Sequence, residues 1–117
     1  MRGAAGERLA ADYYRKKGYQ VIGTGYRSRF GEIDLIVKNR KYIVFAEVKL
    51  RASDTWVRPG AYVDERKQRR ILTTARLWLE QNETELQPRF DVVEILTDPD
   101  GKHSKISVLE NAFGDDT

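Results

Sequence analysis

The sequence predicts an α/β fold in which one helix is followed by three strands, a second helix and two further strands. Two segments place apolar residues three to four positions apart, which is typical of amphipathic helices. Between them lies a run rich in β-branched and aromatic residues, split by a short polar break, which is typical of a hairpin. Two more strand-like runs follow the second helical segment. This alternation indicates the α/β class.

The first helix is expected from about residue 3 to residue 17. Gly18 marks its end, because glycine commonly follows the last helical residue. Glu7 borders the apolar stripe of this helix, which comprises Leu9, Ala10, Tyr13 and Tyr14. Two interpretations of Glu7 are open. It either places negative charge favourably near a helix start or belongs to a functional site.

A first strand is expected over residues 19–26, where Gly23 and Gly25 suggest a bulge or a close backbone approach. A basic turn over residues 27–31 then leads into the central hairpin. That turn is either a solvated loop or, because it precedes Asp34 so closely, a phosphate contact.

The central hairpin spans residues 31–51 and carries charges within otherwise apolar strands, at Asp34, Glu47 and Lys49. Charged residues are almost never fully buried unless they are paired or bind a ligand. A turn centred between Asn39 and Arg40 would put Asp34 opposite Phe45 and Glu47 opposite Glu32. Since side chains alternate along a strand, Asp34, Glu47 and Lys49 would share one face, with the two carboxylates as diagonal neighbours.

An irregular connection over residues 52–63 contains Trp56 and Arg58, which either stack on unpaired bases or fix the loop to the protein. Asp64 is the expected N-cap of the second helix, and Gln68 points toward the protein body. Cations at a helix start are disfavoured by the helix dipole. The basic residues there therefore suggest a bound anion, although a solvated face is the alternative; they are Arg66, Lys67, Arg69 and Arg70.

After Pro88, strands are expected over residues 89–97 and 105–110, joined by a turn at residues 98–101. Residues 1–113 are expected to form one domain and residues 114–117 a flexible tail. The role of Asp91 is open at this stage.

Composition excludes several classes of site. The chain has no cysteine and a single histidine, so disulfides, thiolate zinc sites and histidine-based triads have almost nothing to be built from. The net charge of +3 only weakly favours an anionic partner. No apolar run resembles a signal peptide or a membrane span, which predicts a cytoplasmic protein without a membrane partner.

Two converging carboxylates without nearby histidine or cysteine favour a hard divalent cation bound through oxygen, Mg²⁺ or Mn²⁺. Such an ion lowers the pKa of a bound water and neutralises charge on a phosphate. Lys49, on the same face as Glu47, would then lie beside the attacking water. The alternative is a surface ion pair of little energetic worth.

The motifs of the hairpin support a resemblance. Arg27-x-Arg29-Phe30-Gly31-Glu32-Ile33-Asp34-Leu35-Ile36 and Val44-Phe45-x-Glu47-Val48-Lys49-x-Arg51 resemble the YraN family of small bacterial proteins. Further blocks in both helices and at residues 89–93 extend the resemblance over nearly the whole chain. That family is similar to the restriction-endonuclease-like PD-(D/E)xK nucleases, and within them to archaeal Holliday-junction resolvases. A departure is Gly25, where an asparagine is expected.

The resemblance implies a mixed sheet of four or five strands flanked by helices, in the order α-β-β-β-α-β-β. It makes Asp34, Glu47 and Glu7 metal ligands and Lys49 the catalytic lysine. Gln68 matches the polar residue on the helix after the motif strand. Phosphates would be held by the basic residues Arg29, Arg51, Arg66, Lys67, Arg69 and Arg70.

The leading hypothesis is a metal-dependent endonuclease acting on DNA, including branched or structured DNA in repair or recombination. A homodimer would fit junction cutting, which needs two symmetry-related cuts. Two alternatives are kept: a nucleic-acid-binding module of the same fold with little cleavage activity, and an interaction protein whose charges merely pair with one another.

Overall fold

A computed structural model describes residues 4–52, 63–100 and 103–114. Its elements are α1 (Ala4–Lys16), β1 (Gln20–Ser28), β2 (Gly31–Lys38), β3 (Tyr42–Ala52), α2 (Glu65–Gln81), β4 (Gln87–Thr97) and β5 (Ser104–Phe113). The order α-β-β-β-α-β-β is as predicted, and the arrangement is restriction-endonuclease-like. The predicted roles of Trp56 and Arg58 lie outside the described residues. None of the described helices is long and apolar enough to cross a membrane.

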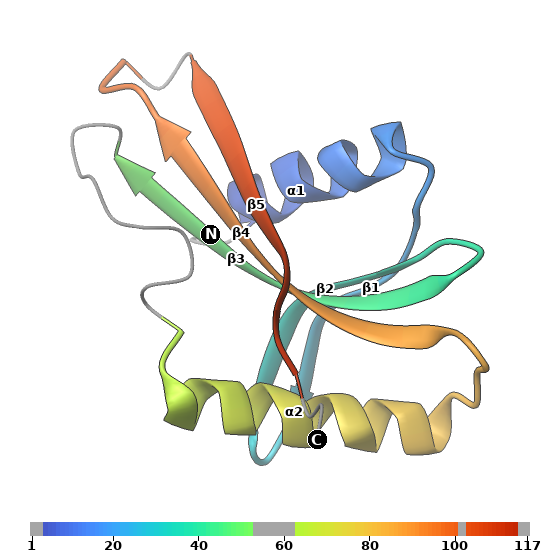
Figure 1. The fold of residues 1–117 in the computed structure, drawn as a ribbon. Helices are drawn as coiled ribbons and strands as arrows, with labels where there is room; N and C mark the ends of the chain where they lie inside the picture. The colour runs from blue at the N-terminus through green and yellow to red at the C-terminus, as the bar shows by residue number, and fades with distance from the viewer. Residues whose placement is uncertain (1–3, 53–62, 101–102, 115–117) are drawn as a thin grey trace.

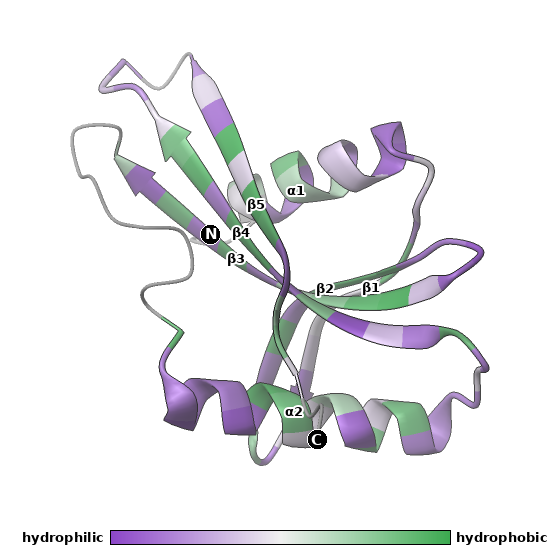
Figure 2. Cartoon of the chain, in the orientation of Figure 1, coloured by the Kyte–Doolittle hydropathy of each residue, from purple (hydrophilic) through white to green (hydrophobic). Residues whose placement is uncertain are grey.

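The five strands form one mixed sheet in the order β1-β2-β3-β4-β5, in which only the β3–β4 pair is parallel. The two helices cover opposite faces of the sheet (Figure 1). On one face, α1 buries Ala10, Ala11 and Tyr14 against the strands. On the other face, α2 buries Ile71 and Ala75. The first turns of α2 are hydrophilic and its apolar bands follow further along the helix (Figure 2).

Local signals in the sequence explain where the helices begin and end. The Asp64 side chain caps α2 by accepting from the Lys67 amide at 2.9 Å. After α1, Gly18 adopts a φ of 92°, which glycine enters without steric cost. Gly25 has a φ of 59°. Asparagine is the other residue that visits this left-handed region routinely, so the conformation accounts for glycine where asparagine was expected.

The predicted register of the central hairpin is wrong by two residues. Lys38 pairs with Ile43 and Ile36 with Phe45, so Phe45 does not lie opposite Asp34. The reason is the turn. Asn39 donates its amide to the Tyr42 carbonyl, and its side chain accepts from the Lys41 and Tyr42 amides, which closes a longer turn than the one assumed. A shift of two leaves the strand faces unchanged, whereas a shift of one would have reversed them.

The sheet divides where β2 leaves β3. Their pairing ends at Leu35 and Ala46, while β2 continues alongside β1 as far as Gly31 and β3 continues alongside β4 as far as Ala52. In Figure 1 the β1–β2 turn runs to α2, and the carboxyl ends of β3 and β4 run the opposite way. We call the point of separation the fork. Asp34 and Glu47 are the first residues beyond the last β2–β3 pair.

Candidate functional site

Asp34 holds a fixed position at the fork. Its Oδ2 accepts a hydrogen bond from the Val48 amide of β3 at 2.8 Å, so a side chain bridges the strands where the regular ladder has ended. Burial raises the pKa of Asp34, and the Val48 hydrogen bond opposes that rise. Asp34 is therefore a half-buried carboxylate whose orientation is set by the backbone of β3.

Glu47 is the most perturbed carboxylate at the fork. Its side chain is only 6% exposed, and its Oε2 lies 3.2 Å from Nζ of Lys67 on α2. Its Oε1 is buried and finds no hydrogen-bond partner among the described residues. Burial raises the pKa of Glu47 to about 7, the charge of Asp34 adds to the rise, and Lys67 opposes it. A buried carboxylate with an unsatisfied oxygen marks a place for a further ligand.

Two more acidic residues act on the fork. Partial burial raises the pKa of Glu7 on α1, and the charges of Asp34 and Glu32 raise it further. Glu32 also raises the pKa values of Asp34 and Glu47. Sequence reasoning did not include Glu32 in the site. Its position two residues before Asp34 on the same strand is the signal that could have included it.

Lys49 and Gln68 lie on elements that flank the fork. Lys49 is half-buried on β3, two residues after Glu47, and is aligned with Glu94 of β4. Gln68 Nε2 donates to the Val63 carbonyl at 3.0 Å. Its predicted inward-facing polar group thus has a partner, which ties the start of α2 to the residue that precedes its N-cap. The role predicted for Lys49 stays a prediction, and Gln68 makes a contact that positions the start of α2.

Two of the predicted phosphate-binding residues lie in ion pairs with buried acids. Lys67 contacts Glu47, as described above. Arg51 Nε lies 2.8 Å from Glu94 Oε1, with side-chain exposures of 15% and 3%. The second oxygen of Glu94, Oε2, is buried without a hydrogen-bond partner among the described residues. Glu94 was not predicted, because nothing in a single strand reveals which acid a parallel neighbour brings beside Arg51.

The other four predicted phosphate-binding residues converge on one open pocket of about 620 Å³ between the β1–β2 turn and α2. We call it the arginine pocket. Among the described residues its lining contains four arginines and no acidic side chain; the lining residues are Ser28, Arg29, Phe30, Gly31, Arg66, Arg69, Arg70 and Thr73. Such a surface is electrostatically suited to phosphate groups.

Asp91 lies away from the fork, in a buried network on the α1 face. Its carboxylate is fully buried and accepts from the Tyr14 hydroxyl at 2.7 Å. It also accepts two bonds from Arg89, at 3.0 and 2.8 Å, and one from the Asn111 amide at 3.0 Å. Both oxygens are therefore satisfied, and the network joins α1, β4 and β5. The open question about Asp91 is answered in favour of a structural role.

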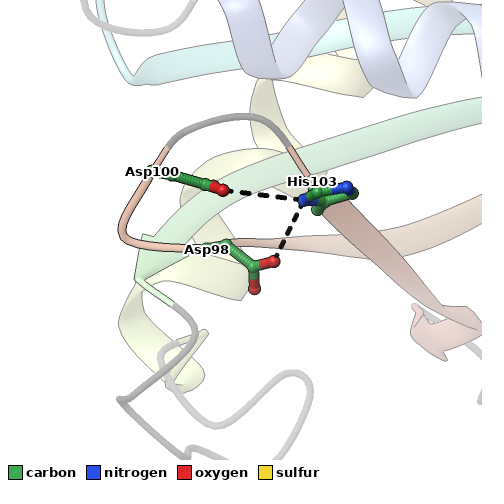
Figure 3. A group of neighbouring side chains, drawn as sticks. All are labelled: Asp98, Asp100 and His103. Atoms are coloured by element: carbon green, nitrogen blue, oxygen red, sulfur yellow. Dashed lines mark ion pairs between the residues drawn. The ribbon is translucent and has the colours of Figure 1, made fainter.

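A separate acidic group surrounds His103 at the β4–β5 connection. His103 Nδ1 lies 3.5 Å from Asp98 Oδ2 and 3.8 Å from Asp100 Oδ2. Figure 3 draws the three side chains and marks both ion pairs. Within the described ranges it is the one group of three potential metal ligands with all its ligand atoms within 4.8 Å. Its side chains are exposed, and exposed acidic groups are common without an ion. Glu7, Asp34 and Glu47 are thus more widely spread than this group.

Comparison with known proteins identifies the family. A model of the uncharacterised protein family UPF0102 matches residues 6–95. A UPF0102 protein of Symbiobacterium thermophilum is 42% identical over 95% of this chain and 94% of its own length. One from Caldanaerobacter subterraneus subsp. tengcongensis is 38% identical over 95% of this chain and 93% of its own. These matches confirm the resemblance carried by the hairpin motifs, and the chain belongs to the UPF0102 family.

Proposed function

We propose that this protein is a metal-dependent endonuclease that hydrolyses phosphodiester bonds of DNA, including branched or structured DNA. The observation that carries the proposal is the carboxylate pair at the fork. Glu47 is buried, and its Oε1 has no partner among the residues that the structure describes; burial raises its pKa, and the charge of Asp34 adds to the rise. A site that keeps two acids close at a cost in stability is better explained by a ligand than by packing.

The residues at the fork fit a hard divalent cation. All the donors are carboxylate oxygens, and Mg²⁺ is commonly held by one or two carboxylates together with waters and substrate phosphates. Glu47 Oε1 and the Asp34 oxygen not bonded to Val48 would be the first donors to it, and Glu7, whose pKa burial raises and the charge of Asp34 raises further, would be a third. When bound, such an ion supplies an acidified water and neutralises charge on the phosphate.

The protein's own groups have separate tasks in this proposal. The Val48 amide holds Asp34 in one orientation, so little reorganisation is needed on binding. Glu47 has to be deprotonated to act as a ligand, and Lys67 favours that charged form. Lys49, two residues beyond Glu47 on β3, would stabilise negative charge developing on the phosphate. The arginine pocket would hold the nucleic acid through its phosphates.

One observation favours the second candidate, a nucleic-acid-binding module with little cleavage activity. Lys67 already neutralises Glu47 at 3.2 Å, and Glu7, Asp34 and Glu47 are not gathered as tightly as a preformed three-carboxylate site requires. A module of this kind would keep the arginine pocket and make no use of a metal. The two candidates therefore differ in whether the protein cleaves DNA when a divalent ion is supplied.

The experiment that separates them is cleavage of linear, single-stranded, flapped and four-way DNA with Mg²⁺ or Mn²⁺. We expect metal-dependent cutting of at least one substrate, and loss of at least about a hundredfold in rate in Asp34→Asn. Asp98→Asn is the matched control, because it removes an exposed carboxylate from the β4–β5 connection.

The outcomes divide the candidates as follows. Absence of cutting with salt-sensitive binding kept in both variants would support the binding module. Absence of both cutting and binding would contradict the nucleic-acid role itself. Because junction cutting requires paired cuts, the same preparation should be a homodimer in solution if four-way DNA is the preferred substrate.

A further inference from the structure

The arginine pocket contains an aromatic side chain that phosphate binding alone does not explain. Phe30 lies in the two-residue turn between β1 and β2 and is 44% exposed. The guanidinium of Arg29 lies over its ring, 5.2 Å from the centroid. Three further arginines of α2 line the same pocket. A single exposed aromatic residue needs no explanation by itself, but a ring among four arginines is a surface on which a base can stack.

The turn that carries Phe30 is fixed against α2. Ser28 Oγ accepts from the Phe30 amide at 3.0 Å and lies 2.9 Å from the Thr74 hydroxyl. A Cβ at Gly31 would approach Cβ of Arg70 to 3.3 Å, so glycine permits this close contact. The backbone that carries Phe30 is therefore held by the Ser28 hydroxyl and by direct packing of the turn on the helix.

The residues of α2 that line the pocket lie on one face of the helix. Their spacing of three and four positions places them along one side of the pocket; they are Arg66, Arg69, Arg70 and Thr73. Arg69 has an exposed partner in Glu65 at 4.0 Å, a contact of little energetic worth. Aromatic rings with flanking cations are how proteins hold unpaired nucleotides, since bases stack on the ring and phosphates meet the cations.

We propose that the arginine pocket binds unpaired nucleotides, with Phe30 as the base-stacking residue and the four arginines as phosphate contacts. This inference rests on the proposed function and narrows it. The substrate class becomes nucleic acid that exposes unpaired bases, such as a flap, a gap or an opened junction arm. A base inside an intact duplex has both faces covered and cannot stack on Phe30.

The test is equilibrium binding in EDTA, so that no cleavage contributes. The probes are a fluorescent oligo-dT of about twelve nucleotides and a duplex of the same length. Phe30→Leu should lose about tenfold in affinity for the single strand and keep its duplex affinity, while Phe30→Trp should keep both. Because Phe30 is largely exposed, equal melting temperatures should show that these variants fold.

A charge variant tests the second half of the proposal. Arg66→Gln should weaken single-strand binding and reduce the slope of log affinity against log salt by about 0.7. Arg40→Gln, an exposed arginine in the β2–β3 turn, is the matched control and should change neither.

Two outcomes would overturn the inference. One is a Phe30→Leu variant whose affinities for single strand and duplex fall equally, or whose affinities for both are unchanged. The other is an oligo-glutamate peptide of matched charge that competes as well as oligo-dT, which would make the pocket a general anion site. Failure of cleavage in the presence of Mg²⁺ would leave these measurements in EDTA unchanged. The proposed function and this inference therefore fail separately.

Discussion

Two of the buried groups of charges among the described residues differ in how completely they are paired: one lies on the α1 face and the other at the fork. On the α1 face, Asp91 accepts four hydrogen bonds, from Tyr14, Arg89 and Asn111. At the fork, Glu47 pairs with Lys67, and its Oε1 has no hydrogen-bond partner among the described residues.

The pKa shifts of Arg89, Tyr14 and Glu47 have different causes in the two groups. Buried Arg89 would lose its charge more readily on its own, but Asp91 outweighs burial and raises the pKa of Arg89. Burial also raises the pKa of the Tyr14 hydroxyl, and the charge of Asp91 adds to it, so Tyr14 stays a donor. At the fork, burial and like charge both raise the pKa of Glu47. The hydrogen bonds of the first group are satisfied and stabilise the fold, whereas the second group keeps a buried acid incompletely paired among the described residues.

The largest effect on stability is expected from Asp91→Ala. Its removal leaves Arg89 buried without its carboxylate and Tyr14 without its acceptor, so the free energy of unfolding should fall by about 3–5 kcal/mol. Urea denaturation measures it. A loss below about 1 kcal/mol would contradict the structural role of the network, and Asp12→Ala, an exposed acid on α1, is the control.

The fork, in contrast, should make the free energy of unfolding fall as the pH rises. The pKa of Glu47 is raised from 4.5 to about 7, so the folded state binds the proton more tightly than the unfolded state. The stability contributed by that proton is fully present below pH 4.5 and is lost as the pH rises through 7. The loss should reach about 3 kcal/mol in EDTA.

Glu47→Gln isolates this effect, because the amide keeps the shape and carries no titrating charge. Its free energy of unfolding should be flatter between pH 5 and 8 than that of the unmodified chain, and higher at pH 8. Asp98→Asn should leave the slope unchanged. Parallel pH profiles for Glu47→Gln and the unmodified chain would show that Glu47 does not carry the raised pKa.

The sequence was sufficient to predict the order of helices and strands, but not which charged side chains pair with one another. The end of α1 before Gly18 and the start of α2 after Asp64 follow from short-range backbone preferences, which the sequence displays. The placement of Glu47 on β3 follows from the same kind of local pattern. The two-residue error in register arose because the Asn39 side chain accepts two amides and so enlarges the turn. Sequence periodicity does not report such a hydrogen bond.

The sequence also does not predict which buried carboxylates have all their hydrogen bonds satisfied. Asp91 and Glu47 are both acids within largely apolar strands. Only the packing of α1 brings Tyr14 to the first, and only the packing of α2 brings Lys67 to the second. The distinction between a satisfied and an unsatisfied carboxylate is therefore tertiary information.

Lys67→Met sharpens the comparison by removing a cation that partly pairs Glu47 at the fork. Since Lys67 opposes the rise, the pKa of Glu47 should move above 7, and the free energy of unfolding at pH 8 should fall by about 2 kcal/mol. Carboxyl chemical shifts followed by NMR against pH measure the first effect. Arg69→Met is the control, because Arg69 pairs with the exposed Glu65. An unchanged pKa of Glu47 in Lys67→Met would show that the Lys67–Glu47 pair does not form in solution.

The smallest effect is expected from Ser28→Ala, which tests whether the arginine pocket depends on its fixed turn. The variant removes the acceptor of the Phe30 amide and the contact with Thr74, so the free energy of unfolding should fall by about 1 kcal/mol. Affinity for oligo-dT should fall severalfold, because Phe30 must then be ordered on binding. Ser104→Ala, at the exposed start of β5, is the control. Loss of stability without loss of affinity would mean that the turn need not be fixed for the pocket to bind, and Phe30 would then act as an adaptable contact.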